Sequence, residues 1–296
     1  MSVPELHVPS LYRLHGTVDS IGIRLGALII PKYFRDGIDS PTVADHLDAV
    51  ELDVPELRTE GEYDVSATTL VGDLDATVRL ASWTGPDAPT IVYHHGAGEV
   101  PYDTSFDRIF PKEDLKVNLF AVRAPFHDST ASFKEGIRTL SNLVAMLAVS
   151  VEVIEAVVDH TREETDGSVT VAGTSLGGFV TNLHHIHYGS VDASVPLLSG
   201  LAMDDVFLDS IYSKGVSPRA KEDDSEVRQV LNFVDAFAET EPGTVHPLLA
   251  RFDRIVRYDV QRASYGDRPV AIINRGHVTG ALASTTLRQH VLSCVG

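Results

Sequence analysis

The chain of 296 residues contains 43% hydrophobic residues and one cysteine, and its formal net charge is −18. A single cysteine excludes an intramolecular disulfide, and such an acidic chain offers no basic face for the phosphates of a nucleic acid. The length fits one large α/β domain or two small ones.

The sequence predicts a cytoplasmic protein with no membrane partner. The residues from Met1 to Glu5 lack the basic start and the apolar stretch of a signal peptide. The apolar run 143–158 is too short to span a bilayer and contains Glu152 and Glu155. An acidic, lysine-poor composition suits the salt-rich cytosol of a halophile, and it suits an ordinary acidic bacterial or archaeal protein equally well.

The first third of the chain predicts a lead-in followed by strands. Residues 1–49 are punctuated by prolines; we expect them to pack on the main domain without contributing chemistry, and 23–34 is compatible with a helix. The alternating, β-branched stretches 50–57 and 67–83 predict an antiparallel start to a sheet.

Two loops that follow apolar strands carry histidines. The predicted strand 90–94 ends at His95, and the predicted strand 117–122 is followed by a loop that contains His127. A metal site would need further ligands at a recognisable spacing, and none is present. We therefore expect His95 and His127 to line a substrate pocket, with a solvated loop position as the alternative for His127.

A long helix is predicted from about residue 133 to residue 163, with a strongly apolar middle. A core helix packed on a parallel sheet explains this composition, because such sheets are covered on both faces. A membrane helix is the alternative.

The stretch 168–178 carries the clearest chemical signal. An apolar strand runs into Gly173, Ser175 stands two residues later, and Gly177 follows before a helix-compatible segment. A serine at the tip of a sharp, strained turn leaves no space for side chains two residues before and after it. An ordinary glycine-rich turn has the same pattern, so the assignment depends on an acid and a base elsewhere in the chain.

The helix after this turn contains His184, His185 and His187, which we expect on its solvated side. Their spacing is not that of the H-E-x-x-H zinc motif, so no metal site is predicted. Beyond a further strand at 193–198, residues 201–241 are charged and carry a helical repeat of apolar residues.

Two polar residues follow the last two predicted strands. Asp253 comes shortly after an apolar run, and His277 follows Gly276 just past the final strand at 269–273. Ser175, Asp253 and His277 therefore follow one another in the order that is expected when a G-x-S-x-G serine lies between a strand and a helix.

These motifs together resemble the α/β-hydrolase family over residues 50–296. The resemblance implies a mostly parallel eight-stranded sheet with helices on both faces, and a small helical cap at 201–241 after the sixth strand. It also implies roles for individual residues: Ser175 as nucleophile, Asp253 as acid, His277 as base, and the backbone N–H groups of Ala97 and Leu176 as the oxyanion hole.

Other aspartates compete for the role of the acid. Asp204 and Asp205 follow the sixth strand, where some family members place their acid. Asp259 and Asp267 fit less well, because they lie within or after the helix that follows Asp253.

The predicted function is hydrolysis of a carboxylic ester through an acyl-enzyme on Ser175. The substrate would be a small acyl compound, and the chemistry requires neither a metal nor an organic cofactor. A peptidase, a thioesterase or an acyltransferase would use the same residues. A non-catalytic α/β-hydrolase scaffold that binds a ligand or a partner protein is the alternative from another class.

Overall fold

One sheet of nine strands organises the computed structural model, which describes residues 15–21, 31–111, 115–241 and 243–296. The strand order is β1-β2-β3-β5-β4-β6-β7-β8-β9. The pairs from β1 through β3 to β5 are antiparallel, and all pairs from β5 to β9 are parallel. The strands are β1 Glu51–Asp53, β2 Gly61–Thr69, β3 Gly72–Ser82, β4 Thr90–His94, β5 Asn118–Arg123, β6 Val169–Thr174, β7 Ala193–Leu197, β8 Leu248–Ala250 and β9 Ala271–Ile273.

The predicted α/β class is confirmed, but the sheet has one strand more than the eight predicted. The additional strand is accounted for by β1, an edge strand of three residues that pairs antiparallel with β2. β1 lies within the stretch 50–57, where the sequence predicts a strand, so the predicted antiparallel start of the sheet is confirmed and only the total of eight strands is wrong.

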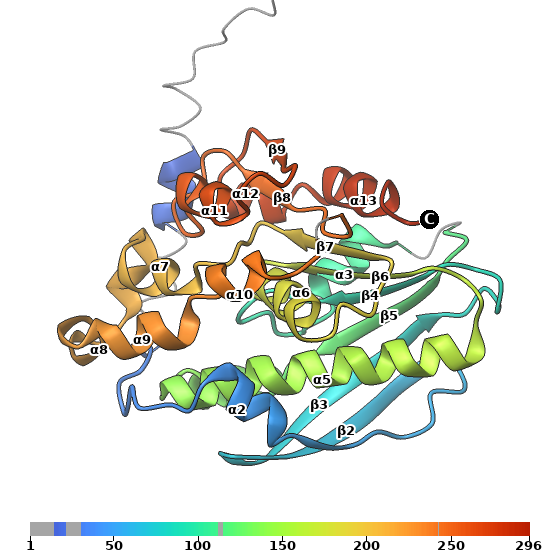
Figure 1. Cartoon of the computed structure of the whole chain (residues 1–296), viewed down its shortest axis with the longest axis horizontal. Coiled ribbons are helices and arrows are strands. Elements are labelled where there is room, and N and C mark those ends of the chain that lie inside the picture. The colour runs from blue at the N-terminus through green and yellow to red at the C-terminus, as the bar shows by residue number, and fades with distance from the viewer. Residues whose placement is uncertain (1–14, 22–30, 112–114, 242) are drawn as a thin grey trace, which may run out of the picture.

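Helices cover both faces of the sheet (Figure 1). The residues of β4 show how the faces divide: Val92 packs in the core that contains α5 and α6, whereas Ile91 and Tyr93 pack in the core that contains α3 and α13. All five residues of β4 are buried, as expected for a parallel strand covered on both sides. Besides the short helix of residues 15–21, the described helices outside the segment between β7 and β8 are α2 Val43–Asp48, α3 Thr104–Ile109, α4 Thr130–Gly136, α5 Leu140–Glu164, α6 Leu176–His187, α11 Tyr258–Ser264, α12 His277–Ala281 and α13 Ser284–Leu292.

Helix α5 is a core helix. It is long and apolar enough to cross a membrane by length and composition, but 72% of its most apolar window is buried inside the protein. It packs against α2, α6 and strands β2 to β6. The core-helix interpretation of its apolar sequence is therefore confirmed.

The predicted helix 133–163 is interrupted. It is divided into α4 and α5, because Thr139 starts a new helix by accepting a hydrogen bond from the N–H of Asn142. The backbone of Leu140 also donates to the carbonyl of Gly37, which ties the break to the N-terminal segment. Of the helix predicted at 23–34, residues 23–30 lie outside the described residues, and Tyr33 forms a β-bridge with Val216 instead.

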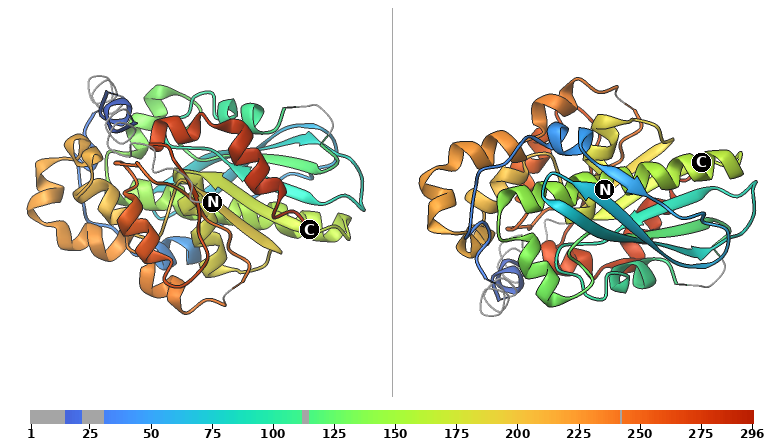
Figure 2. Two further views of the ribbon diagram at one scale, coloured as in Figure 1. Left: turned by 90° about the horizontal axis from the view of Figure 1, so that it is seen from above. Right: turned by 90° about the horizontal axis from the view of Figure 1, so that it is seen from below.

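The connection between β7 and β8 is helical. It contains α7 Met203–Leu208, the 3₁₀ helix η1 Ile211–Gly215, α8 Pro218–Glu222, α9 Asp224–Leu231 and α10 Val234–Ala238. In both views of Figure 2 the orange helices lie at one end of the molecule, away from the C-terminus. The blue helix formed by residues 15–21 lies beside α11 and α12 (Figure 1).

Candidate active site

Ser175 sits in a strained turn between β6 and α6. Its φ of 57° and ψ of −110° lie outside the regions that a non-glycine residue normally adopts. A Cβ on Gly173 would lie 2.2 Å from the carbonyl oxygen of Gly177, and a Cβ on Gly177 would lie 2.2 Å from the carbonyl oxygen of His94. The two glycines are therefore required by close backbone packing, as the spacing of the motif predicts.

Ser175, His277 and Asp253 form a continuous hydrogen-bonded chain. The Ser175 hydroxyl lies 3.0 Å from Nε2 of His277, and Nδ1 of His277 lies 2.7 Å from a carboxylate oxygen of Asp253. Because Nδ1 donates to the carboxylate, Nε2 is left as an acceptor that faces the serine. The structure thus brings together three residues that are 78 and 24 positions apart in the sequence (253 − 175 and 277 − 253).

The Asp253 side chain is fixed from both sides. One oxygen accepts the N–H groups of Ile255 and Val256, each at 2.8 Å, and the other faces His277. Burial raises the pKa of Asp253, and the positive charge on His277 and the backbone donors oppose this increase by favouring the ionised carboxylate. Burial alone would lower the pKa of His277, but the charges of Asp253 and of Asp19 outweigh it and hold that pKa above its usual 6.5.

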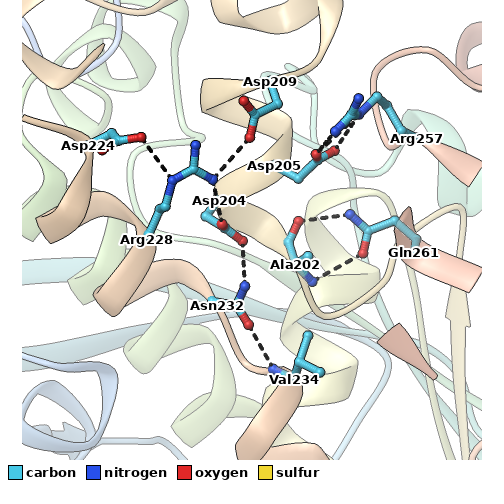
Figure 3. Close-up of polar contacts among 10 residues, drawn as sticks. All are labelled: Ala202, Asp204, Asp205, Asp209, Asp224, Arg228, Asn232, Val234, Arg257 and Gln261. Atoms are coloured by element: carbon cyan, nitrogen blue, oxygen red, sulfur yellow. Dashed lines mark hydrogen bonds and ion pairs between the residues drawn. The ribbon is translucent and has the colours of Figure 1, made fainter. Parts of the chain in front are cut away.

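The competing aspartates are engaged elsewhere (Figure 3). Asp204 accepts from Asn232 at 3.0 Å and pairs with Arg228, and Asp205 forms an ion pair with Arg257. Both pairs link α7 to neighbouring helical segments. Gln261 adds two hydrogen bonds to the backbone of Ala202, just before α7.

Ala97, on the loop after β4, lines the same cavity as Ser175. The N–H of Gly96 donates to Glu99 at 3.2 Å, and the N–H of Gly98 donates to Nε2 of His127 at 3.0 Å. Within the described part of the chain, the N–H groups of Ala97 and Leu176 have no hydrogen-bond partner. Ala97 and Leu176 both line the cavity that contains Ser175, as expected for two oxyanion-hole donors.

His95 and His127 do not line this cavity, contrary to the prediction. Both rings are buried and hold the backbone instead: Nε2 of His95 accepts the N–H of Ala124 at 3.0 Å, and Nε2 of His127 accepts that of Gly98. Burial lowers the pKa of His127 to about 4 and that of His95 well below its usual value. The two rings therefore stay neutral and keep their acceptor nitrogens, which join the loop after β4 to the loop after β5.

The cavity beside Ser175 has a volume of about 170 Å³. Apart from Ser175 and His277 its described lining is apolar or tyrosine, and it comes from both ends of the chain. Tyr33 and Tyr212 share a hydrogen bond of 2.6 Å between their hydroxyls. The lining residues are Tyr33, Ala97, Phe133, Ile137, Leu143, Met146, Ser175, Leu176, Phe179, Met203, Val206, Phe207, Tyr212, Ile255, Val256 and His277.

Two residues of the N-terminal segment belong to the site and were missed by the sequence analysis. Tyr33 lines the cavity, and Asp19 is fully buried and contacts the backbone of His277. Neither residue carries a motif. Only the tertiary fold brings them to the site, because Ser175 lies 142 residues after Tyr33 (175 − 33) and His277 lies 258 residues after Asp19.

The histidines of α6 are not all solvated. His187 is exposed, but His184 and His185 are buried. Nε2 of His184 lies 2.8 Å from the carboxylate of Glu155, so the ring binds α6 to α5. A cluster of three side chains suited to a metal ion is not found among the described residues.

Solved structures with the same fold include several esterases. Acetyl xylan esterase 1 from Thermoanaerobacterium sp. JW/SL YS485 is 13% identical with a TM-score of 0.52, and the match covers 87% of this chain and 96% of that one. An esterase from the archaeon Pyrobaculum calidifontis is 13% identical with a TM-score of 0.52, covering 96% and 97%. Est1E from Butyrivibrio proteoclasticus is 17% identical with a TM-score of 0.53, covering 75% and 94%.

At these identities the solved structures establish the fold alone. Among curated proteins, none matches this chain. A family model described as alpha/beta hydrolase domain containing 18 matches residues 108–286, which is more than half of the chain. That stretch includes the serine turn, Asp253 and His277. The chain therefore belongs to the α/β-hydrolase family described as alpha/beta hydrolase domain containing 18.

Proposed function

We propose that this protein is a serine hydrolase that cleaves carboxylic esters carrying a small apolar group. The observation that carries the proposal is the position of the Ser175 hydroxyl, which lies 3.0 Å from Nε2 of His277 at the wall of an apolar cavity. A serine becomes nucleophilic when an adjacent neutral base accepts its proton, and this geometry supplies that base.

The proposed reaction has two steps. His277 removes the proton of Ser175 as the oxygen attacks the ester carbonyl, and Asp253 stabilises the imidazolium that forms. The N–H groups of Ala97 and Leu176 bind the oxyanion; loss of one such donor typically costs about 3 kcal/mol of barrier. His277 then protonates the leaving alcohol. In the second step it activates a water molecule, which releases the acid from Ser175.

The size and the lining of the cavity favour a substrate whose short apolar group enters it. Its volume is about 170 Å³, and an apolar cavity of about 150 Å³ accommodates benzene. Among its described lining residues, His277 is the one with a side chain that ionises near neutral pH, so a charged acyl group would lose its hydration without gaining a partner. A neutral ring or a short aliphatic chain fits this environment.

A substrate panel tests the proposal. We expect p-nitrophenyl esters of butyrate, hexanoate and benzoate to be cleaved faster than the laurate ester, which exceeds the cavity. Matched thioesters, aminoacyl amides and acceptor alcohols test the thioesterase, peptidase and acyltransferase alternatives. A higher kcat/KM on one of these compounds would identify that class, in place of the ester, as the substrate. Ser175 would remain the proposed nucleophile.

Labelling separates a hydrolase from a non-catalytic scaffold. A fluorophosphonate probe reacts with an activated serine, so we expect the wild-type protein to be labelled and Ser175→Ala to remain unlabelled. Thermal unfolding of both proteins controls for the fold. A folded wild-type protein that neither reacts with the probe nor cleaves any ester of the panel would refute the proposed function.

A further inference from the structure

We propose that Asp19 is a positioning residue for the proposed hydrolase reaction: its buried carboxylate fixes the helix start that carries His277 and adds a negative charge to the pair of His277 and Asp253. This inference rests on the proposed function for its kinetic consequences. It assigns a role in the site to a segment that the sequence analysis treated as a lead-in without chemistry.

The contacts of Asp19 are directed at the backbone of the base. One carboxylate oxygen accepts the N–H of His277 at 3.1 Å and that of Arg254 at 3.4 Å, and the other accepts the N–H of Val278 at 3.1 Å. Asp19 is 0% exposed. Helix α12 begins at His277, so its first two N–H groups, which have no partner inside the helix, are both paired by one carboxylate from the N-terminal segment.

The residues around Asp19 show that its carboxylate lies close to the backbone at the start of α12. A Cβ on Gly276 would lie 2.8 Å from one oxygen of Asp19, so a larger residue would displace the carboxylate. One turn before Asp19, Nδ1 of His15 lies 2.9 Å from the hydroxyl of Thr279 in α12. The ring of His15 stacks on Phe252, 5.7 Å between centroids. The helix of residues 15–21 therefore contacts the chain on both sides of the pair formed by Asp253 and His277.

The charge of Asp19 acts on the same pair. Burial lowers the pKa of His277, and Asp253 followed by Asp19 raises it, with a net increase. The other groups that face this region are His15, whose pKa is lowered by burial and by Arg275, and the side chain of Arg254, which lies against Gly16.

Asp19 does not line the cavity, so its removal should act on the base and not on substrate binding. For Asp19→Ala we expect kcat to fall by on the order of 100-fold with little change in KM, because two backbone N–H groups lose their partner and His277 shifts. For Asp19→Asn we expect a smaller loss, about tenfold, because the amide oxygen still accepts one of these hydrogen bonds.

The deciding measurement is the pKa of His277 itself, which does not depend on turnover. Imidazole ¹⁵N resonances are followed by NMR from pH 5 to 9 in the wild-type protein and in Asp19→Asn, and His277 is assigned by its disappearance in His277→Gln. We expect the pKa of His277 to be lower in Asp19→Asn than in the wild-type protein, since a nearby carboxylate no longer favours the imidazolium. A merely structural role predicts no such shift in the folded protein.

Ser20→Ala is the matched control. Ser20 lies on the same helix, and its hydroxyl donates to the carbonyl of Gly16 at 2.7 Å within that helix. We expect it to keep both the pKa of His277 and kcat. The inference is overturned if Asp19→Asn leaves the pKa of His277 and kcat unchanged, or if its activity falls only in proportion to the folded fraction. A wild-type protein without Ser175-dependent labelling contradicts the proposed function alone, since the pKa shift still tests the placement of Asp19.

Discussion

Replacement of Asp253 by asparagine should abolish nearly all turnover in a folded protein. One oxygen of Asp253 accepts the N–H groups of Ile255 and Val256 at 2.8 Å each, and the other accepts Nδ1–H of His277 at 2.7 Å. In Asp253→Asn the two backbone donors require an oxygen, so they fix the orientation of the amide. The NH₂ group must then face Nδ1 of His277.

This orientation selects the wrong tautomer of the base. An NH₂ group that donates to Nδ1 places the imidazole proton on Nε2, which then cannot accept the proton of Ser175. In serine proteases the corresponding change lowers kcat by about 10⁴-fold, which corresponds to about 5.4 kcal/mol at about 1.36 kcal/mol for each factor of ten. We expect a loss of the same order here, because the same two hydrogen bonds are present.

The assay is kcat on the best ester of the panel for the wild-type protein, Asp253→Asn and Asp205→Asn, with thermal unfolding as the control for the fold. Asp205→Asn is the matched variant: it removes a buried carboxylate that pairs with Arg257 and does not contact His277. We expect it to lose far less activity than Asp253→Asn. The opposite ranking would refute the argument and assign the acid to the end of β7.

Three further outcomes are expected. Ser175→Ala should keep the unfolding temperature within a few degrees and lose ester turnover and probe labelling together. The pH profile of kcat/KM should show one acidic limb with a midpoint above 6.5, because Asp253 raises the pKa of His277 and only the neutral ring accepts the serine proton; a midpoint below 6.5 would contradict this. Gly177→Ala should lower the free energy of unfolding by more than about 4 kcal/mol in a urea titration, since its Cβ would lie 2.2 Å from the carbonyl oxygen of His94. Gly215→Ala, where a Cβ meets open space, should lower it by no more than about 1 kcal/mol.

The parts of the site that the sequence predicted are those with a strict local requirement. The turn at Ser175 needs glycines at fixed positions, because a side chain there would meet backbone atoms. Asp253 and His277 follow strands whose apolar runs are readable, and parallel strands bring their carboxyl ends to one edge of the sheet. Sequence order and strand ends were therefore enough to select three residues of the site.

The parts that escaped prediction depend on tertiary contacts between residues without a motif. Asp19 is one aspartate among many acidic residues, and only the fold reveals that its oxygens meet the start of α12. His184 has the same local sequence signal as a solvated histidine, but α5 supplies Glu155 as its partner. His127 was placed near the site, although its role differs, since the sequence does not show that its ring accepts the N–H of Gly98.

Side-chain acceptors determine which backbone N–H groups remain available near Ser175 and His277. On the loop after β4, Glu99 pairs the N–H of Gly96 and His127 pairs that of Gly98, which leaves the N–H of Ala97 between them for the proposed oxyanion. Asp19 pairs the N–H groups at the start of α12 in the same way, and only the ring of His277 then faces Ser175. Dipoles fixed before the substrate arrives need no reorganisation during the reaction, and this is the condition under which they lower its barrier most. A variant that frees one of these neighbouring N–H groups should therefore lower kcat even where it leaves Ser175, His277 and the cavity unchanged.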